Sequence, residues 1–147
     1  MSLPQPQPLD PQIARVLGRF PEVAAAWVFG SEARGQARPD SDLDIGLVFR
    51  QRGATALDHD RALRTMAAQL EAVVPGRAID LVVLESQGPI FCHRVLSEGR
   101  RVYDADPQRR IDFESETYVR YFDFRPTYEL ANQHALAGFR DWFESRR

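Results

Sequence analysis

The fold is indicated most clearly by residues 23–49, which read VAAAWVFGSEARGQARPDSDLDIGLVF. Apolar residues, many of them β-branched or aromatic, fill both ends of this stretch, at 23–29 and 43–49, and each run predicts a buried strand. Gly30-Ser31 ends the first run, a short helical turn is expected at 31–35, and the turn-rich residues 38–41 precede the second run. The stretch therefore predicts two strands with a polar connection between them.

The rest of the chain predicts further strands and helices. Apolar residues recur at helical spacing in several segments, and Pro75-Gly76 and Gly99 end two of them. Pro126 is expected to interrupt the C-terminal helical stretch, because proline removes a helical hydrogen bond. Predicted helices are 11–19, 57–74, 89–98, 107–124 and a last one to the C-terminus, and further strands are 78–84 and 101–103. This order predicts an α/β (α+β) domain, a small sheet with helices packed on it.

Length and composition are those of one globular domain, because 44% of the 147 residues are hydrophobic and 27% are charged. Residues 1–9 are expected to be a loose tail, and 107–147 a C-terminal helical extension. No run approaches the roughly 18 apolar residues that a membrane span needs, and no signal peptide is recognised, so the predicted location is the cytoplasm. A net charge of -2 predicts no direct binding of nucleic acid. The single cysteine, Cys92, excludes an internal disulfide and is expected to be buried and inert.

Two carboxylates open the second strand. Side chains alternate along a strand, so Asp42 and Asp44 are expected to point the same way, roughly 6–7 Å apart. Like charges on one face of a buried strand repel each other and are costly to desolvate. A divalent cation would compensate them, and Mg²⁺ prefers carboxylate oxygens together with substrate phosphates.

A third carboxylate, Asp80, lies within the otherwise apolar residues 78–84. If that strand lies beside the second one, Asp80 completes a cluster that can hold two metal ions about 3.5–4 Å apart. Nearby, Gly30 allows close backbone approach to a phosphate, and the Ser31 hydroxyl can bond its oxygens. Arg34 adds a cationic group for the same triphosphate.

Purely structural interpretations exist for several of these residues. Asp42 and Asp44 could be the solvated start of a strand after a turn. Ser31 could cap the turn after Gly30. Asp80 could form an ion pair with an arginine such as Arg77, and Arg34 could form surface salt bridges with Glu32 or Asp40.

In type and spacing, Gly30-Ser31-Glu32-Ala33-Arg34-Gly35, then Ser41-Asp42-Leu43-Asp44, then Asp80, resemble the minimal nucleotidyltransferases (MNT) of the polymerase-beta superfamily. The resemblance implies a mixed sheet with flanking helices and Mg²⁺-dependent transfer of AMP from ATP. It also implies that Asp42 and Asp44 bind two Mg²⁺ ions. Asp80 would help to bind one of them and ready the attacking hydroxyl, and Ser31 would hold the triphosphate.

Among MNT proteins, the chain resembles the stand-alone antitoxins that pair with a HEPN ribonuclease toxin, because it is little larger than the core. Residues 96–103 and 118–126 resemble a helix-to-strand passage and a C-terminal helix of those antitoxins. The resemblance implies an adenylyltransferase that modifies a tyrosine of the toxin and silences it. Two alternatives stay open: a small-molecule nucleotidyltransferase of the aminoglycoside type, and a non-catalytic antitoxin that acts by binding alone.

Aromatic residues gather in the C-terminal extension, where they could contact a partner or cover the chain's own sheet. They are Phe113, Tyr118, Tyr121, Phe122, Phe124, Tyr128, Phe139, Trp142 and Phe143. His59, His93 and His134 show no ligand spacing and are predicted to be non-catalytic. Arg52 and His59 match the loose Arg-x6-His pattern of HEPN nucleases, but the match spans Gly53 in an expected loop and is interpreted as accidental.

Overall fold

Four strands form one mixed sheet in the computed structural model, which describes residues 9–38 and 40–144. The spatial order is β3-β2-β1-β4. Strand β1 pairs antiparallel with β2 and with β4, whereas β2 and β3 are parallel. The strands are β1 (Val23–Phe29), β2 (Leu43–Phe49), β3 (Ile79–Val83) and β4 (Arg100–Asp104). The predicted mixed sheet is confirmed, and the first two strands have the predicted bounds.

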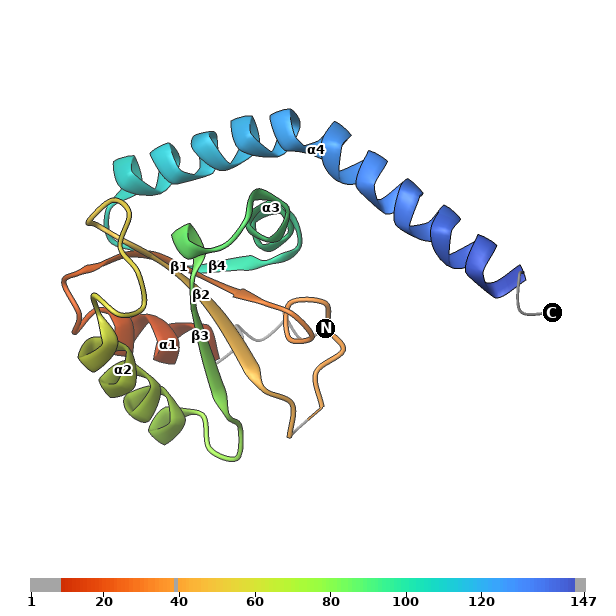
Figure 1. Ribbon diagram of the computed structural model, residues 1–147. Helices are drawn as coiled ribbons and strands as arrows, with labels where there is room; N and C mark the ends of the chain where they lie inside the picture. The colour runs from red at the N-terminus through yellow and green to blue at the C-terminus, as the bar shows by residue number, and fades with distance from the viewer. Residues whose placement is uncertain (1–8, 39, 145–147) are drawn as a thin grey trace, which may run out of the picture.

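Helices cover both faces of this sheet (Figure 1). Helices α1 (Leu9–Leu17) and α2 (Asp60–Val73) pack on one face, and α3 (Pro89–Glu98) and α4 (Pro107–Glu144) pack on the other. A short 3-10 turn, η1 (Leu84–Ser86), joins β3 to α3. Leu9, which the sequence analysis assigned to a loose tail, belongs to α1. Residues 1–8 of that tail lie outside the described part of the chain.

The two faces of the sheet bury two separate hydrophobic cores. In β2, Leu43, Ile45 and Leu47 pack toward α1 and α2. Val48 instead packs toward α3 and α4, with Trp27 of β1. Because side chains alternate along a strand, Asp44 lies on the same face as Val48, the face that α3 and α4 cover.

Pro126 does not end a helix, contrary to the sequence prediction. Helix α4 continues through it to Glu144, and Figure 1 shows the helix changing direction about halfway along. Proline removes one helical hydrogen bond and its ring pushes the preceding turn aside, which bends a helix. Residues 122–133 are exposed, so water can satisfy the freed carbonyl and the helix continues. Although α4 is long, no helix in the described ranges has the apolar character that crossing a bilayer requires.

Candidate active site

Asp44 and Asp80 lie directly opposite each other on neighbouring strands. The parallel register of β2 and β3 pairs these two residues. Val82 packs into the core beneath α3 and α4, so Asp80, two residues earlier, lies on that same face, as Asp44 does. Asp44 is half-buried, whereas Asp80 is exposed. The strand that carries Asp80 therefore lies beside the strand that carries Asp44, which is the condition set by the predicted three-carboxylate cluster.

The environment of Asp44 disfavours its charge. Burial raises the pKa of Asp44, and the negative charges of Asp80 and Asp42 raise it further. A side-chain hydrogen bond with Asp80 acts in the same direction, whereas the Arg77 guanidinium lowers this pKa. The structure thus brings three acidic side chains close enough to repel one another, and a cation would relieve that repulsion.

The donor set suits a magnesium ion, although the carboxylates are not arranged around one. Within residues 9–38 and 40–144, no group of three Asp, Glu, His or Cys side chains is arranged to hold a metal ion. Asp42 lies just before β2 in an exposed position, outside the strand that holds Asp44. Hard carboxylate oxygens that remain open to solvent are nevertheless what Mg²⁺ prefers. Metal binding by Asp42, Asp44 and Asp80 stays a prediction.

Gly30 brings the main chain against the Asp44 carboxyl group. Its φ angle is +72°, in the left-handed region that favours glycine. A Cβ atom added at Gly30 would collide with Oδ2 of Asp44. The backbone conformation therefore favours glycine here, and a side chain would displace the Asp44 carboxylate. Gly30 places the polar turn that follows β1 directly beside the acidic pair.

The turn at residues 30–36, called here the Gly30 turn, is held by its own main chain. The amide of Arg34 donates to the Gly30 carbonyl at 3.2 Å, and that of Gln36 donates to the Ser31 carbonyl at 2.9 Å. In the described part of the chain, no hydrogen bond engages the Ser31 hydroxyl, so the capping interpretation finds no support. Ser31 is half-buried beside Gly30, and its role in holding a triphosphate stays a prediction.

Arg77, which the sequence interpretation considered only as a partner for Asp80, joins the two segments of the site. Its Nε donates to the Ser41 carbonyl at 2.7 Å and its Nη2 to the Asp42 carbonyl at 3.3 Å. Its Nη1 forms an ion pair with Glu32 of the Gly30 turn at 2.9 Å, and both side chains are largely buried. The alternative that paired Arg77 with Asp80 is therefore wrong. No sequence pattern reveals this role, because two of the three acceptors are distant main-chain carbonyls.

Arg34 lies on the exposed side of the Gly30 turn. No ion pair in the described ranges engages it, and Glu32, one suggested partner, is bound to Arg77. Arg34 instead borders a small pocket between the turn and α3. Its predicted contact with a triphosphate stays a prediction.

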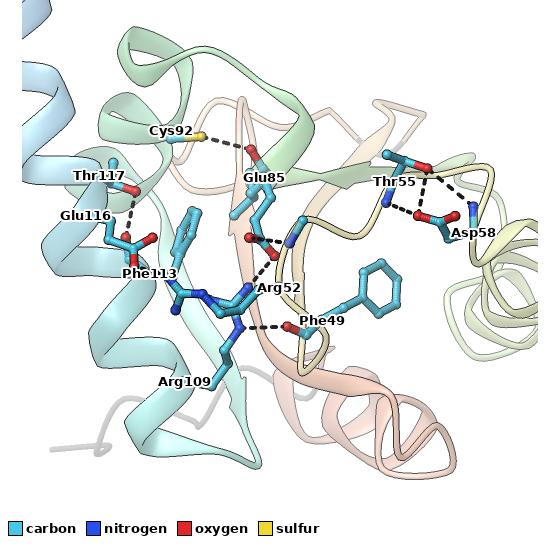
Figure 2. A network of polar contacts seen from close by, with 12 residues as sticks. Phe49, Arg52, Thr55, Asp58, Glu85, Cys92, Arg109, Phe113, Glu116 and Thr117 are labelled. Atoms are coloured by element: carbon cyan, nitrogen blue, oxygen red, sulfur yellow. Dashed lines mark hydrogen bonds and ion pairs between the residues drawn. The ribbon is translucent and has the colours of Figure 1, made fainter.

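The opposite end of β2 holds a separate polar network, shown in Figure 2. Arg109 of α4 donates to the Phe49 carbonyl at 3.0 Å and forms an ion pair with Glu85. Glu85 also accepts from the Gly53 amide at 3.1 Å. A cavity of about 230 Å³ adjoins this network, between the loop after β2 and α4. Because Phe49 ends β2 and Asp44 lies at its start, this cavity is remote from the carboxylates.

The side chains that the sequence analysis interpreted as non-functional, Arg52, His59, His93 and Cys92, make structural contacts. Arg52 pairs with Glu116, and the His59 ring stacks on Phe49 at 4.0 Å between centroids, so the two do not form a joint site. The His93 ring stacks on Tyr121 at 3.5 Å. Cys92 is buried as predicted, and burial raises the pKa of its thiol to about 11. The side chain of His134 lies outside the described ones.

Residues 11–108 match the family described as "Polymerase beta, Nucleotidyltransferase". The chain belongs to this nucleotidyltransferase family. The matched region runs from α1 through β4 to the first residues of α4, so it contains the Gly30 turn and all three acidic residues. Most of α4 lies beyond the match. No curated protein sequence matches the chain.

Chains in solved toxin–antitoxin structures share the fold. A toxin–antitoxin with AMP-PNP has a TM-score of 0.68 at 19% identity, covering 86% of this chain and 98% of that one. The toxin–antitoxin MntA-HepT has a TM-score of 0.65 at 17% identity, covering 89% and 99%. A complex of tri-AMPylated Shewanella oneidensis HEPN toxin with MNT antitoxin has a TM-score of 0.66 at 18% identity, covering 88% and 98%. At these identities the likeness shows a common fold.

Proposed function

We propose that this nucleotidyltransferase is the antitoxin of a HEPN–MNT pair and transfers AMP from ATP to a tyrosine hydroxyl of its HEPN ribonuclease toxin. The observation that carries the enzymatic part is the in-register pair of Asp44 and Asp80 beside the Gly30 turn, in a chain of the polymerase-beta family. ATP is a cytoplasmic metabolite, so the cytoplasm is the compartment that we propose for the reaction.

Each residue of the site has a distinct proposed role. Asp42, Asp44 and Asp80 hold Mg²⁺, which when bound neutralises phosphate charge and favours ionisation of an attacking hydroxyl. Main-chain amides at Gly30 and Ser31, with the Ser31 hydroxyl, bind phosphate oxygens. The substrate is thereby fixed with its α-phosphorus beside the acidic pair.

The transfer itself requires little covalent chemistry from the protein. The acceptor oxygen forms a bond to the α-phosphorus as the bond from that phosphorus to the bridging oxygen of the β-phosphate breaks. Pyrophosphate leaves with the electron pair, and the hydroxyl proton passes to Asp80, whose exposed carboxylate an incoming hydroxyl can reach. Arg34 balances the charge that builds on the leaving group.

Exposed apolar side chains on α4 support a protein acceptor. Val119 and Phe122 are each 61% exposed, and Leu130 is 55% exposed. A row of apolar side chains on an exposed helix marks an interaction surface in many soluble proteins. Phe113, only 5% exposed, packs on Trp27 and covers the sheet instead. The side chains of Phe139, Trp142 and Phe143 lie outside the described ones. Three structures of similar fold are described as toxin–antitoxin complexes, one with a tri-AMPylated HEPN toxin.

The direct test combines the purified chain, labelled ATP and Mg²⁺ with the helical protein encoded by the neighbouring gene. We expect label on a tyrosine of that protein, loss of its ribonuclease activity, and no label with EDTA. The double variant Asp42→Asn/Asp44→Asn should transfer no label, whereas Asp60→Asn on the exposed surface of α2 should act as wild type. Absence of label with a well-folded chain would contradict the proposal.

Two other outcomes would favour the remaining alternatives. Full neutralisation of the toxin by the double variant would indicate an antitoxin that acts by binding alone. Label on aminoglycosides in the absence of any partner would indicate a small-molecule enzyme.

A further inference from the structure

Helix α3 and the Gly30 turn face each other across a pocket of about 170 Å³. Arginines enter its lining from both sides, Arg34 from the turn and Arg94 from α3. The remaining lining is largely apolar, with one carboxylate. The lining residues are Phe29, Gly30, Arg34, Phe91, Arg94, Val95 and Glu98.

This pocket adjoins the acidic site through Gly30. The same glycine whose missing side chain makes room for the Asp44 carboxyl group also lines the pocket. A ligand that rests on the Gly30 turn with one end beside the carboxylates therefore has its other end in reach of the pocket. A nucleoside triphosphate has this form, because its α-phosphate must lie beside the acidic residues and its β- and γ-phosphates must lie elsewhere.

Both arginines of the pocket are exposed, unlike the half-buried arginines whose charges are paired within the fold. Arg100 pairs with Asp10, and Arg110 with Asp104. By contrast, no ion pair in the described ranges engages Arg34 or Arg94. Guanidinium groups that share a pocket repel each other, and the planar fork of each suits phosphate oxygens. The pocket therefore presents positive charge that a polyanion would compensate.

Glu98 lies one helical turn after Arg94 and also lines the pocket, but it forms no ion pair with Arg94 within the described contacts. One carboxylate against two guanidinium groups leaves the lining with a net positive charge. A phosphate group can therefore still be bound there.

Packing holds Arg94 at a fixed position relative to the turn. The Phe91 ring of α3 meets the Phe29 ring of β1 edge-on at 5.5 Å between centroids. Val95, the neighbour of Arg94, is 2% exposed in the core beneath α3. Groups on a packed helix are placed more accurately than groups on a loop. Only the side chain of Arg94 has to move to meet a ligand.

We infer that Arg94 binds the β- and γ-phosphates of the nucleoside triphosphate, opposite Arg34, and stabilises pyrophosphate as it leaves. The inference rests on the proposed function and adds to it a contact from α3, which the sequence motif does not contain. The bond that breaks leaves its electron pair on the pyrophosphate, and the two arginines neutralise the charge that develops there.

The test compares two ligands across matched variants. Calorimetry would measure the binding of a non-hydrolysable ATP analogue and of AMP, both with Mg²⁺, to wild type, Arg94→Ala, Arg94→Lys and Arg64→Ala. Arg64 is an exposed arginine of α2 that pairs with Asp60, so its loss changes the net charge equally. We expect Arg94→Ala to weaken the analogue about tenfold or more, as loss of a charged hydrogen bond does. AMP has no β- or γ-phosphate, so the affinity for AMP should change by less than about twofold. Arg94→Lys should restore part of the lost affinity for the analogue.

Three results would overturn the inference. Unchanged binding of the analogue to Arg94→Ala, when wild type binds it, removes the role of Arg94 and leaves the proposed function standing. Equal losses for AMP and the analogue, or a fall in Tm with the substitution, indicate a structural role for Arg94. Failure of wild type to bind the analogue at all removes the proposed function and this inference together.

Discussion

The two ends of strand β2 differ in the charges that they bring together: opposite charges meet at one end and like charges at the other. At its last residue, the Phe49 carbonyl accepts from Arg109, whose own charge is met by Glu85 (Figure 2). At its start, Asp44 lies beside Asp80, and burial together with the neighbouring negative charges raises its pKa. Opposite charges brought together fasten α4 to the sheet, whereas like charges brought together disfavour the folded state. A cost of this kind is a sign of function, because packing alone does not explain it.

The largest expected effect is on activity at the acidic end. Asp44→Asn keeps the size and shape of the side chain but removes its charge. We expect transfer of label to fall by about 10²–10³-fold, the loss typical when one preorganised charge-stabilising group is removed. Steady-state transfer assays with saturating Mg²⁺ would measure it. Near-wild-type activity of a folded Asp44→Asn protein would contradict the assigned role.

The opposite end should show the largest effect on stability. The Arg109 side chain is 7% exposed, so Arg109→Ala would leave Glu85 charged and largely buried without its partner. We expect the free energy of unfolding to fall by about 3 kcal/mol or more. Arg52→Ala is the control, because this exposed arginine forms a surface pair with Glu116 and its loss should change the free energy of unfolding far less. Chemical denaturation of both variants would separate them, and equal losses would contradict the comparison.

A smaller effect is expected where the main chain meets the acidic pair. Gly30 and Gly53 have nearly equal φ angles, +72° and +70°, but only at Gly30 would a Cβ collide with Asp44. Both alanine variants should lose about 1–2 kcal/mol from the left-handed conformation. Gly30→Ala should lose more, and it should also weaken binding of an ATP analogue, whereas Gly53→Ala should not. Equal losses of stability and of analogue binding in the two variants would show that the close approach of Gly30 to Asp44 affects neither property.

The smallest expected effect is a pH dependence of stability. The folded-state pKa of Asp44 is raised above its ordinary value of 3.8, so its contribution to stability is present below that value and is lost as pH rises through the folded pKa. In EDTA at pH 7, Asp44→Asn should therefore have a slightly higher Tm than wild type. The difference should shrink as the pH is lowered toward 4, because wild-type Asp44 then becomes protonated. Melting curves at both pH values would measure it, and a lower Tm for the variant at pH 7 would contradict the raised pKa.

The alternation and spacing of residues predicted the strands, and the bounds of two of them, but not how the strands pair or which side chains meet. The strands at 23–29 and 43–49 emerged with correct bounds because their apolar runs end at Gly30 and at the polar residues that follow Phe49. Asp80 could be placed beside Asp44 only on the condition that their strands were neighbours, because the sequence of a single strand does not determine its pairing register. Arg77 was misinterpreted because its acceptors are carbonyl groups of another segment. Pro126 was misinterpreted because proline bends an exposed helix as readily as it ends one.

The parallel pairing of β2 with β3 has a consequence for how the acidic pair can be lost. Parallel neighbours need a connection that crosses over the sheet, and here that connection contains α2. Local unfolding of residues 60–73 would release β3 and carry Asp80 away from Asp44, with every acidic side chain still present. Catalytic competence therefore depends on a helix that contributes no group to the chemistry, and protease sensitivity within α2 would report on it.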